Sequence, residues 1–330
     1  MSGRVSVTLA CWDYDRTQPL ADGSVQPEGV ELTYLSLPIE ETFFRMLRYR
    51  EFDVAEMSLS SYVVDLTSMG NFIAIPVFPS RSFRHNGIYV NAASGIERPS
   101  DLIGKVVGVP EYQLTAGVWI RGILSDHYGV PVPSVRYRTG GLHEPGRTEK
   151  VPLELPPEIE VEPIPPDRTL AEMLVSGEID ALYSPRVPRP FAERRPEVRR
   201  LFPDPRREEE RYFAQTGIFP IMHTVVLRRD LYERRPWLAQ SMYKAFLRAK
   251  DSTMERLREM AASRYMLPWL YEEVERAQAL MGEDYWPYGL ARNQTTLATF
   301  LRYAFEQGLA RRQLTPAELF APETLDAYVI

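Results

Sequence analysis

The 330-residue sequence has one cysteine, four histidines, no long hydrophobic run and no excess of positive charge. A single cysteine, Cys11, excludes a disulfide within the chain and fits a reducing compartment. The formal net charge of −6 supplies no positive field to attract phosphates, which argues against a general nucleic-acid binder. The longest apolar runs are far shorter than the roughly 20 residues that a membrane-spanning helix needs, so no membrane partner is expected.

The amino-terminal segment, MSGRVSVTLACWDYD, also has too short an apolar run for a secretory signal, which needs about 7–15 apolar residues. We therefore expect a cytoplasmic protein. The composition, 44% hydrophobic and 25% charged, is that of a globular protein. At this length, two domains are expected rather than a single core.

Sequence motifs for several common chemistries are absent. The chain has no GxGxxG, P-loop, HExxH, paired CxxC or GxSxG segment. The histidines are too scattered to define a metal site by their spacing. The sequence predicts no metal site and leaves a divalent ion open.

Strand and helix signals alternate through the first two thirds of the chain. The segment RVSVTLA (4–10) alternates polar and apolar residues with the period of a half-buried strand, and 30–37 is a second candidate. Helices are predicted at 40–52 and 113–127, whereas seven prolines within 145–166 indicate an extended loop. This alternation is typical of an α/β fold with a mainly parallel sheet.

The last third of the sequence is almost wholly helical in pattern. Helices are expected at 236–260, roughly 264–281 and 293–308. The segment TPAE (315–318) is a capping box with proline at the first helical position, which predicts a further helix start.

Two strand-like segments, GIYVN (87–91) and HTVVL (223–227), suit two crossings of the chain between lobes. The predicted architecture is therefore two-lobed. Residues 1–91 plus 216–330 form a discontinuous first lobe with the carboxy-terminal helices, and 92–215 form an inserted α/β lobe. A ligand is expected in the cleft between the lobes, near the carboxyl ends of the strands.

Two of the four histidines, His85 and His223, stand at the heads of these strand-like runs. A lone histidine is more often structural than functional. A pair at the two crossings would converge at the cleft floor, so His85 and His223 are the main catalytic candidates. In an extended 81–89 segment, Arg81 and His85 share one face and Arg84 points away.

Polar clusters at predicted strand ends supply the other candidates. Serines and backbone N–H groups at a helix start can bind a carboxylate, and arginine forks match carboxylates, although a plain helix cap or a surface charge is the ordinary use of each. Glu56 and Asp13 are additional catalytic candidates. The candidates for substrate binding are Arg81, Arg84, Ser58, Ser60, Ser61, Glu111, Tyr112, Gln113, Thr115, Arg186, Trp12 and Arg16.

Several segments together give the chain a family resemblance over nearly its whole length. It resembles the 4,5-dihydroxyphthalate decarboxylase family, which is related to the type II periplasmic-binding-protein fold. The segments that carry the resemblance are LACWDYDRTQPLADGSVQPEGVELTYL, FDVAEMSLSSY, IPVFPSRSFRH, GVPEYQLTAGVWIRGIL, GEIDALYSPR and TGIFPIMHTVV.

The resemblance implies a two-lobed binding-protein architecture in a cytosolic enzyme that needs no organic cofactor. It also implies conversion of 4,5-dihydroxyphthalate, a small aromatic dicarboxylate, to protocatechuate and carbon dioxide. A base that takes the phenolic proton para to the leaving carboxylate pushes electron density onto the carboxyl-bearing carbon, which an acid then protonates. His85 and His223 are the candidates for these two roles, in either order, because unperturbed histidine titrates near neutrality.

Three alternatives stay open at this point. The chain could be a solute-binding protein of a transporter, since the same fold serves both purposes. It could be a decarboxylase of another hydroxylated aromatic acid, or a metal-assisted enzyme in which Glu56, Asp13 and the two histidines meet around a divalent ion. A homo-oligomer is also open, because the aromatic residues of the helical tail suit either a core or a subunit contact. Those aromatics are Tyr265, Trp269, Tyr271 and Trp286.

Overall fold

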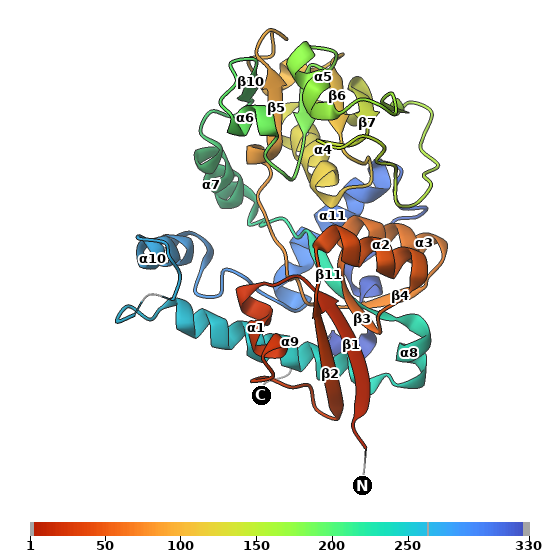
Figure 1. Ribbon diagram of the computed structural model, residues 1–330, viewed down its shortest axis with the longest axis vertical. Helices are drawn as coiled ribbons and strands as arrows, with labels where there is room; N and C mark the ends of the chain where they lie inside the picture. Colours follow the sequence, from red (N-terminus) through yellow and green to blue (C-terminus); the bar gives the residue numbers. More distant parts are fainter. Residues whose placement is uncertain (1–2, 263, 326–330) are drawn as a thin grey trace. The chain divides into compact units, whose positions relative to one another are not determined.

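The computed structural model describes residues 3–262 and 264–325 and divides into two compact units. The first unit comprises Met1–Arg81, Thr216–Ala298 and Leu314–Ile330. The second comprises Ser82–Gln215 and Thr299–Gln313. Both units are built from a sheet with helices, so the chain has the α/β character that the alternating sequence pattern predicts (Figure 1).

The sheet of the first unit has five strands in the order β2-β1-β3-β11-β4. Its strands are β1 (Val5–Cys11), β2 (Val30–Ser36), β3 (Val54–Ser58), β4 (Phe72–Ile75) and β11 (His223–Arg228). Strand β1 pairs in parallel with β2 and β3, whereas β11 pairs antiparallel with both β3 and β4. The sheet is therefore mixed, because β11 enters from a distant part of the chain and runs against its neighbours.

Most helices of the first unit lie around this sheet (Figure 1). They are α1 (Gln18–Ala21), α2 (Ile39–Tyr49), α3 (Leu59–Ser68), α8 (Arg229–Arg234), α9 (Trp237–Leu257), α10 (Leu270–Met281) and the start of α11 (Gln294–Glu306). Helix α2 contacts β1 and β3, α9 contacts β4, and α10 contacts α9. Buried side chains of β1 and β3 contribute to the unit's core, among them Leu9, Val54 and Met57.

The sheet of the second unit has six strands in the order β10-β5-β9-β6-β7-β8. Its strands are β5 (Ile88–Asn91), β6 (Val106–Val109), β7 (Arg136–Thr139), β8 (Val161–Pro163), β9 (Ala181–Tyr183) and β10 (Val198–Arg200). Strand β5 pairs antiparallel with both β9 and β10. This pairing makes residues 88–91 part of the second unit, whereas the sequence analysis assigned them to the first lobe.

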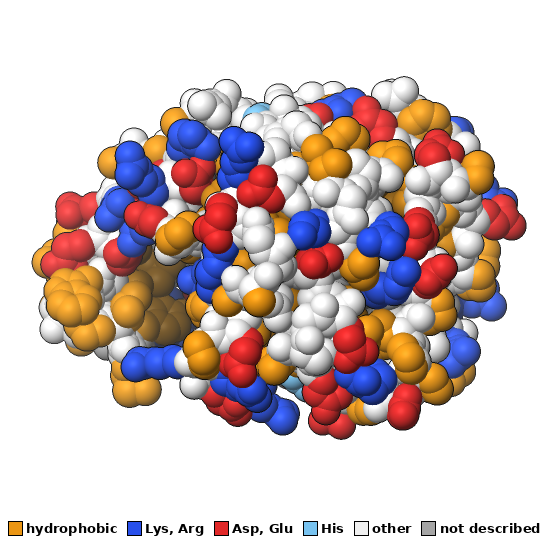
Figure 2. Space-filling view, turned by 90° about the horizontal axis from the view of Figure 1, so that it is seen from above, with side chains coloured by type: hydrophobic (Ala, Val, Ile, Leu, Met, Phe, Trp, Pro, Cys, Tyr) orange, Lys and Arg blue, Asp and Glu red, His pale blue; other side chains and the backbone are white. Residues whose placement is uncertain are grey.

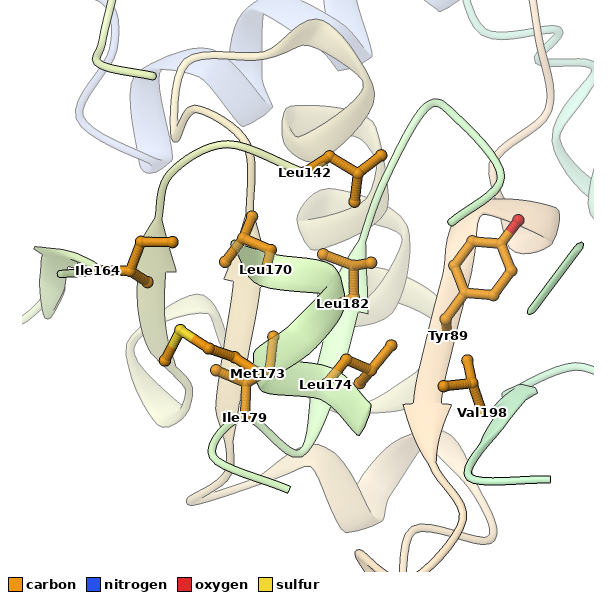
Figure 3. Packing of buried hydrophobic residues seen from close by; sticks show 9 residues of the cluster. All are labelled: Tyr89, Leu142, Ile164, Leu170, Met173, Leu174, Ile179, Leu182 and Val198. Atoms are coloured by element: carbon orange, nitrogen blue, oxygen red, sulfur yellow. The ribbon is translucent and has the colours of Figure 1, made fainter. Parts of the chain in front are cut away.

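The helices of the second unit are α4 (Thr115–Tyr128), α5 (Leu170–Ser176), α6 (Arg189–Ala192), α7 (Pro205–Thr216) and the end of α11. Residues 299–313 belong here, and not with the other carboxy-terminal helices, because the rings of Phe300 and Tyr303 lie 5.4 and 5.7 Å from that of Trp119 on α4. Figure 3 shows the apolar side chains of α5 packed against the sheet. That buried cluster consists of Tyr89, Leu142, Ile164, Leu170, Met173, Leu174, Ile179, Leu182 and Val198.

Three sequence expectations differ from the structure in detail. The 81–89 segment is not one extended strand, because residues 85–87 form a 3₁₀ turn, and the shared face expected for Arg81 and His85 is lost. The helix expected at 264–281 begins at Leu270, and residue 263 lies outside the described residues. The capping box at Thr315 is present, but it starts a 3₁₀ turn of four residues.

The surface in Figure 2 carries lysine and arginine side chains interspersed with aspartate and glutamate. No broad basic area appears on this face, which agrees with the net charge of −6. Within the described ranges, the structure has no helix long and apolar enough to cross a membrane.

Candidate active site

Strand pairing in the first unit brings Glu56 and His223 together. Glu56 lies near the carboxyl end of β3, and His223 is the first residue of β11. In the antiparallel register Glu56 is opposite Val225, so His223 lies two residues further along the same face of the sheet. The carboxyl end of the parallel strand β1 meets the same edge and places Cys11 beside them.

The Glu56 carboxylate is fully buried and accepts four hydrogen bonds. Its Oε1 atom lies 2.6 Å from the Tyr14 hydroxyl and 2.6 Å from Nδ1 of His223. Its Oε2 atom accepts from the backbone N–H of Trp12 at 3.1 Å and from the Cys11 thiol at 3.5 Å. A carboxylate has about four lone-pair sites, so these contacts saturate it and fix its orientation.

Burial pushes the pKa of Glu56 upward, but the charge of His223 and hydrogen bonds from His223, Tyr14 and Trp12 outweigh burial. The pKa of Glu56 therefore lies below its ordinary value, and the group is an anion at neutral pH. Burial and the Glu56 charge raise the pKa of Tyr14 and of Cys11. Tyr14 and Cys11 are accordingly neutral groups that donate to Glu56, and the thiol is unsuited to act as a nucleophile.

His223 is oriented by this carboxylate. With Glu56 ionised, Nδ1 carries the hydrogen that it donates, so in the neutral imidazole the other ring nitrogen, Nε2, holds the lone pair. The ring meets Phe43 edge-on at 4.9 Å between centroids, and 12% of the side chain is exposed. Within residues 3–262 and 264–325, no protein group hydrogen-bonds to Nε2, so this nitrogen can exchange a proton with a ligand.

Arg16 stacks on the ring of Tyr14, whose hydroxyl contacts Glu56. Its guanidinium carbon is 4.1 Å from the centre of the Tyr14 ring and 4.4 Å from that of Trp286, so the cation is stacked between two aromatic faces. Its Nε donates to the carbonyl of Pro79 at 2.6 Å, and Nη1 donates to Asp15 at 3.0 Å. Within the described part of the chain, no protein acceptor forms a hydrogen bond with Nη2 of Arg16. This guanidinium nitrogen can therefore donate to an anionic ligand.

The other predicted residues of the first unit lie on β3, on α3 and in the segment after β1. Ser58 ends β3, and Ser60 and Ser61 lie buried in the first turn of α3. Trp12 contributes its backbone N–H to Glu56, while its side chain is 42% exposed. Asp13 is exposed and accepts a hydrogen bond from Gln18, apart from the Glu56 carboxylate.

Arg81 is held by protein carbonyls in the structure. Its Nη1 donates to Phe219 at 3.0 Å, and its Nη2 donates to Pro287 at 2.7 Å and to the side chain of Asn293. Burial lowers the pKa of Arg81 to about 9. These contacts tie three loops of the first unit together, and a role for Arg81 in substrate binding stays a prediction.

His85 belongs to the second unit and is surrounded by aromatic rings. It is 1% exposed, and its ring centroid lies 5.8, 5.2 and 5.5 Å from those of Tyr128, Phe202 and Tyr212. Neither ring nitrogen has a hydrogen-bond partner among the residues that the structure describes. Burial, helped by the charges of Arg211 and His127, lowers the pKa of His85 to about 4.

The neighbouring Arg84 is also buried within the second unit. Burial lowers its pKa to about 10, and the charge of Glu209 acts in the opposite direction. Burial raises the pKa of Glu209 to about 7, and its carboxylate accepts from the backbone N–H of Asn86 at 3.0 Å. Arg84 and Glu209 are thus an internal charge pair beside His85.

The predicted turn before α4 is occupied by groups from the 145–166 loop. Glu111 is 1% exposed and is paired with Arg147 at 2.6 Å and Lys150 at 2.5 Å. The carboxylate of Glu149 accepts from the backbone N–H of Tyr112 and, at 3.0 Å, from the side chain of Gln113. The donors of this turn thus bind a carboxylate of the chain itself, and their role in substrate binding stays a prediction.

The last two predicted residues of the second unit differ in exposure. Thr115 is buried at the first position of α4, and Arg186 is exposed on the loop after β9. No metal-binding group of three or more histidine, cysteine, aspartate or glutamate side chains occurs among the described residues.

Sequence comparison places the chain within a known family. It is 42% identical over 329 residues to 4,5-dihydroxyphthalate decarboxylase of Comamonas testosteroni, a match that covers 99% of both chains. The chain belongs to the 4,5-dihydroxyphthalate decarboxylase family. The decarboxylase of the same name from Pseudomonas putida is 46% identical over 204 residues, which cover 61% of this chain and 79% of that protein. No family model matches the chain.

Solved structures give this decarboxylase-family chain its fold class. The periplasmic sulfonate-binding protein SsuA of Methylobacillus flagellatus superposes with a TM-score of 0.55 at 16% identity, covering 98% of this chain and 93% of that one. The aliphatic sulphonate-binding protein SsuA of Escherichia coli gives 0.53 at 12% identity, covering 97% and 99%. The predicted periplasmic-binding-protein-like fold is confirmed, and at such low identity the similarity concerns the fold alone.

Sequence reasoning selected several of the residues that meet in this candidate site and did not select Tyr14. Glu56, His223, Arg16 and the backbone of Trp12 meet in the first unit, as their places at strand ends suggested. Tyr14, which links Arg16 to Glu56, was not among the predicted site residues. Its position in the WDYDR segment after β1 was the available signal, because that segment already contained three candidates, Trp12, Asp13 and Arg16.

Proposed function

We propose that this chain is a carboxy-lyase that converts 4,5-dihydroxyphthalate to 3,4-dihydroxybenzoate and carbon dioxide. The names of the two decarboxylase relatives support the substrate and the reaction. The observation that carries the chemistry is the 2.6 Å contact between buried Glu56 and Nδ1 of His223, because it leaves a basic ring nitrogen beside a fixed anion. This arrangement suits proton transfer to and from a phenol.

We propose that Arg16 binds the carboxylate that the product keeps. The substrate carries two adjacent carboxylates, and the Arg16 guanidinium arm that has no partner among the described residues can hydrogen-bond one of them. Stacking between Tyr14 and Trp286 keeps the Arg16 side chain in place, so little conformational entropy is lost when the ligand binds. The buried serines that follow β3, Ser58, Ser60 and Ser61, are proposed to help position the substrate.

In the proposed reaction, Nε2 of His223 takes the proton of the ring hydroxyl para to the leaving carboxylate. The phenolate oxygen pushes its electron pair into the ring, and the carboxyl-bearing carbon takes up a proton from a solvent-derived acid. The bond to the carboxylate then breaks, its electron pair restores the aromatic ring, and carbon dioxide leaves. The phenolate regains a proton, so the reaction consumes one proton overall.

Glu56 is proposed to hold His223 in the tautomer that has its lone pair on Nε2 and to stabilise the imidazolium that forms. The equivalent carboxylate–histidine arrangement in other acid–base enzymes serves the same purpose. The proposal gives His223 the phenolic proton and assigns no proton transfer to His85, whose ring nitrogens are buried among aromatic side chains in the structure. The role in catalysis predicted for His85 from the sequence stays a prediction.

The test is incubation of the purified protein with 4,5-dihydroxyphthalate while carbon dioxide and 3,4-dihydroxybenzoate are measured, with and without a chelator. Turnover that His223→Gln abolishes and that His127→Gln retains supports the proposal, since His127 is an exposed histidine of the second unit. Binding of the substrate without turnover would instead favour a solute-binding protein. Turnover lost on chelation would point to a metal-assisted reaction.

We also propose that the reaction takes place in the cytoplasm, because the single cysteine is buried and reduced, as is usual in that compartment. Cell fractionation followed by the turnover assay tests this location. Recovery of the activity in the periplasmic fraction would contradict it.

A further inference from the structure

We propose that Tyr14 is a positioning residue for this reaction, acting on proton transfer through its hydroxyl and on carboxylate binding through its ring. The inference rests on the proposed function and assigns a role to a residue outside the predicted site. Tyr14 stands between the two halves of the site. Its hydroxyl contacts Glu56 at 2.6 Å, and its ring lies 4.1 Å from the guanidinium carbon of Arg16.

The hydroxyl of Tyr14 shares one carboxylate oxygen with His223. Both groups contact Oε1 of Glu56, whereas the other two donors bind Oε2. Because burial and the Glu56 charge keep the phenol protonated, Tyr14 always donates to this oxygen. Its hydrogen bond withdraws part of the negative charge that His223 would otherwise meet. Tyr14 therefore sets how tightly the Glu56–His223 pair holds a proton.

The ring of Tyr14 has a separate effect. It forms one face of the stack that holds Arg16, and Trp286 forms the other at 4.4 Å. A cation between two rings keeps its charge while losing freedom to move, which favours a fixed carboxylate contact. The backbone that carries the ring is held in place, because the carbonyl of Tyr14 accepts from the backbone N–H groups of Thr17 and Gln18, both at 3.0 Å.

Two substitutions separate these effects. Tyr14→Phe removes the hydroxyl and keeps the ring, so we expect kcat to fall about tenfold, the equivalent of one hydrogen bond to a charged group, with KM within about twofold. Without the hydroxyl the Glu56–His223 pair takes up its proton at higher pH, and the acid limb of kcat/KM moves upward by about one pH unit. Tyr14→Leu removes the ring as well, and we expect KM to rise about fivefold in addition.

Tyr34→Phe is the matched control. The Tyr34 hydroxyl donates to the carbonyl of Trp12 at 2.9 Å, lies 2.9 Å from the Thr17 hydroxyl and makes no hydrogen bond to Glu56. This variant loses a neighbouring phenol and is expected to lose some stability while keeping the wild-type acid limb. An unshifted acid limb in Tyr14→Phe, or an equal shift in Tyr34→Phe, would overturn the role of the hydroxyl. Equal KM values in Tyr14→Phe and Tyr14→Leu would overturn the role of the ring.

A measurement on substrate-free protein keeps this inference distinct from the proposed reaction. The pH titration of the His223 ring protons, followed by NMR with His223→Gln for assignment, is expected to move to higher pH in Tyr14→Phe and not in Tyr34→Phe. A wild-type protein without turnover on 4,5-dihydroxyphthalate would contradict the proposed function alone. An unchanged His223 titration in Tyr14→Phe would contradict the coupling through Glu56 whether or not the protein decarboxylates.

Discussion

Glu56 and His223 lie on paired antiparallel strands, two positions apart in register, and their side chains meet at 2.6 Å. The two residues are separated by 167 positions in the sequence. Because the carboxylate is fully buried and saturated with donors, it cannot rotate away, and the imidazole is held with Nε2 available. This relationship underlies the first of the predictions.

Glu56→Gln should lower kcat by roughly 10²-fold or more, because the amide removes the anion that stabilises the imidazolium and can favour the wrong tautomer. Steady-state kinetics with 4,5-dihydroxyphthalate provide the measurement. Glu31→Gln is the control, since Glu31 is an exposed residue of the same unit that accepts a hydrogen bond from Ser6. A Glu56→Gln enzyme with wild-type kcat would mean that the carboxylate has no part in proton transfer.

Arg16→Lys should raise KM by about 10- to 100-fold with a smaller effect on kcat. A lysine keeps the charge but loses the planar fork and its stacking on Tyr14 and Trp286, and a charge-assisted hydrogen bond contributes about 1.5–3 kcal/mol. The same change at Arg4, an exposed arginine of the first unit, should leave KM unaltered. If KM in Arg16→Lys matches that of the wild type, the substrate carboxylate is bound elsewhere.

His85 should make the folded chain sensitive to acid. Its pKa is about 4 in the fold against an ordinary 6.5, so as the pH falls from 6.5 toward 4 the unfolded chain takes up this proton first. The contribution of His85 to the free energy of unfolding, up to about 3 kcal/mol, is complete above pH 6.5 and is lost as the pH falls through this window. Urea unfolding at a series of pH values measures it.

The variant that tests this is His85→Phe, which keeps a ring among Tyr128, Phe202 and Tyr212 and has no nitrogen to protonate. The free energy of unfolding as a function of pH is compared between His85→Phe and the wild type, and the difference gives the contribution of His85. Burial raises the pKa of Glu209 to about 7, so its contribution to the free energy of unfolding has the opposite sign and is lost as the pH rises from roughly 4.5 to 7. This contribution is present in both proteins. Parallel profiles for His85→Phe and wild type would show that His85 does not titrate in this way.

Glu111→Gln should destabilise the protein by roughly 2–4 kcal/mol, because it leaves the charges of Arg147 and Lys150 without their buried partner. Glu162→Gln breaks only an exposed pair with Arg138 and should cost less than about 1 kcal/mol. Chemical denaturation compares the two. A Glu111→Gln protein with wild-type stability and a raised KM would support the alternative prediction from the sequence, that Glu111 binds substrate.

Much of the local structure follows from the sequence. The alternating segment at 4–10 and the helical pattern at 113–127 correspond to β1 and α4, because side-chain periodicity reports which face of an element is buried. The turn at 111–115 was predicted to bind substrate, which stays a prediction; in the structure Tyr112 and Gln113 donate to a carboxylate of the chain itself. What the sequence could not supply was the source of that carboxylate, Glu149, which comes from a proline-rich loop without periodic pattern.

Within the candidate site, the sequence alone determined which segments end at strand termini, and hence that Glu56, His223 and Arg16 deserved consideration. Only the tertiary structure decided that β11 pairs antiparallel beside β3, which makes neighbours of Glu56 and His223 and brings Tyr14 between Glu56 and Arg16. It also surrounded His85 with aromatic rings and bound Arg81 to backbone carbonyls. The reason is physical: periodicity and capping are set by residues within a few positions, whereas strand order and the partner of a buried charge depend on contacts between residues far apart in the chain.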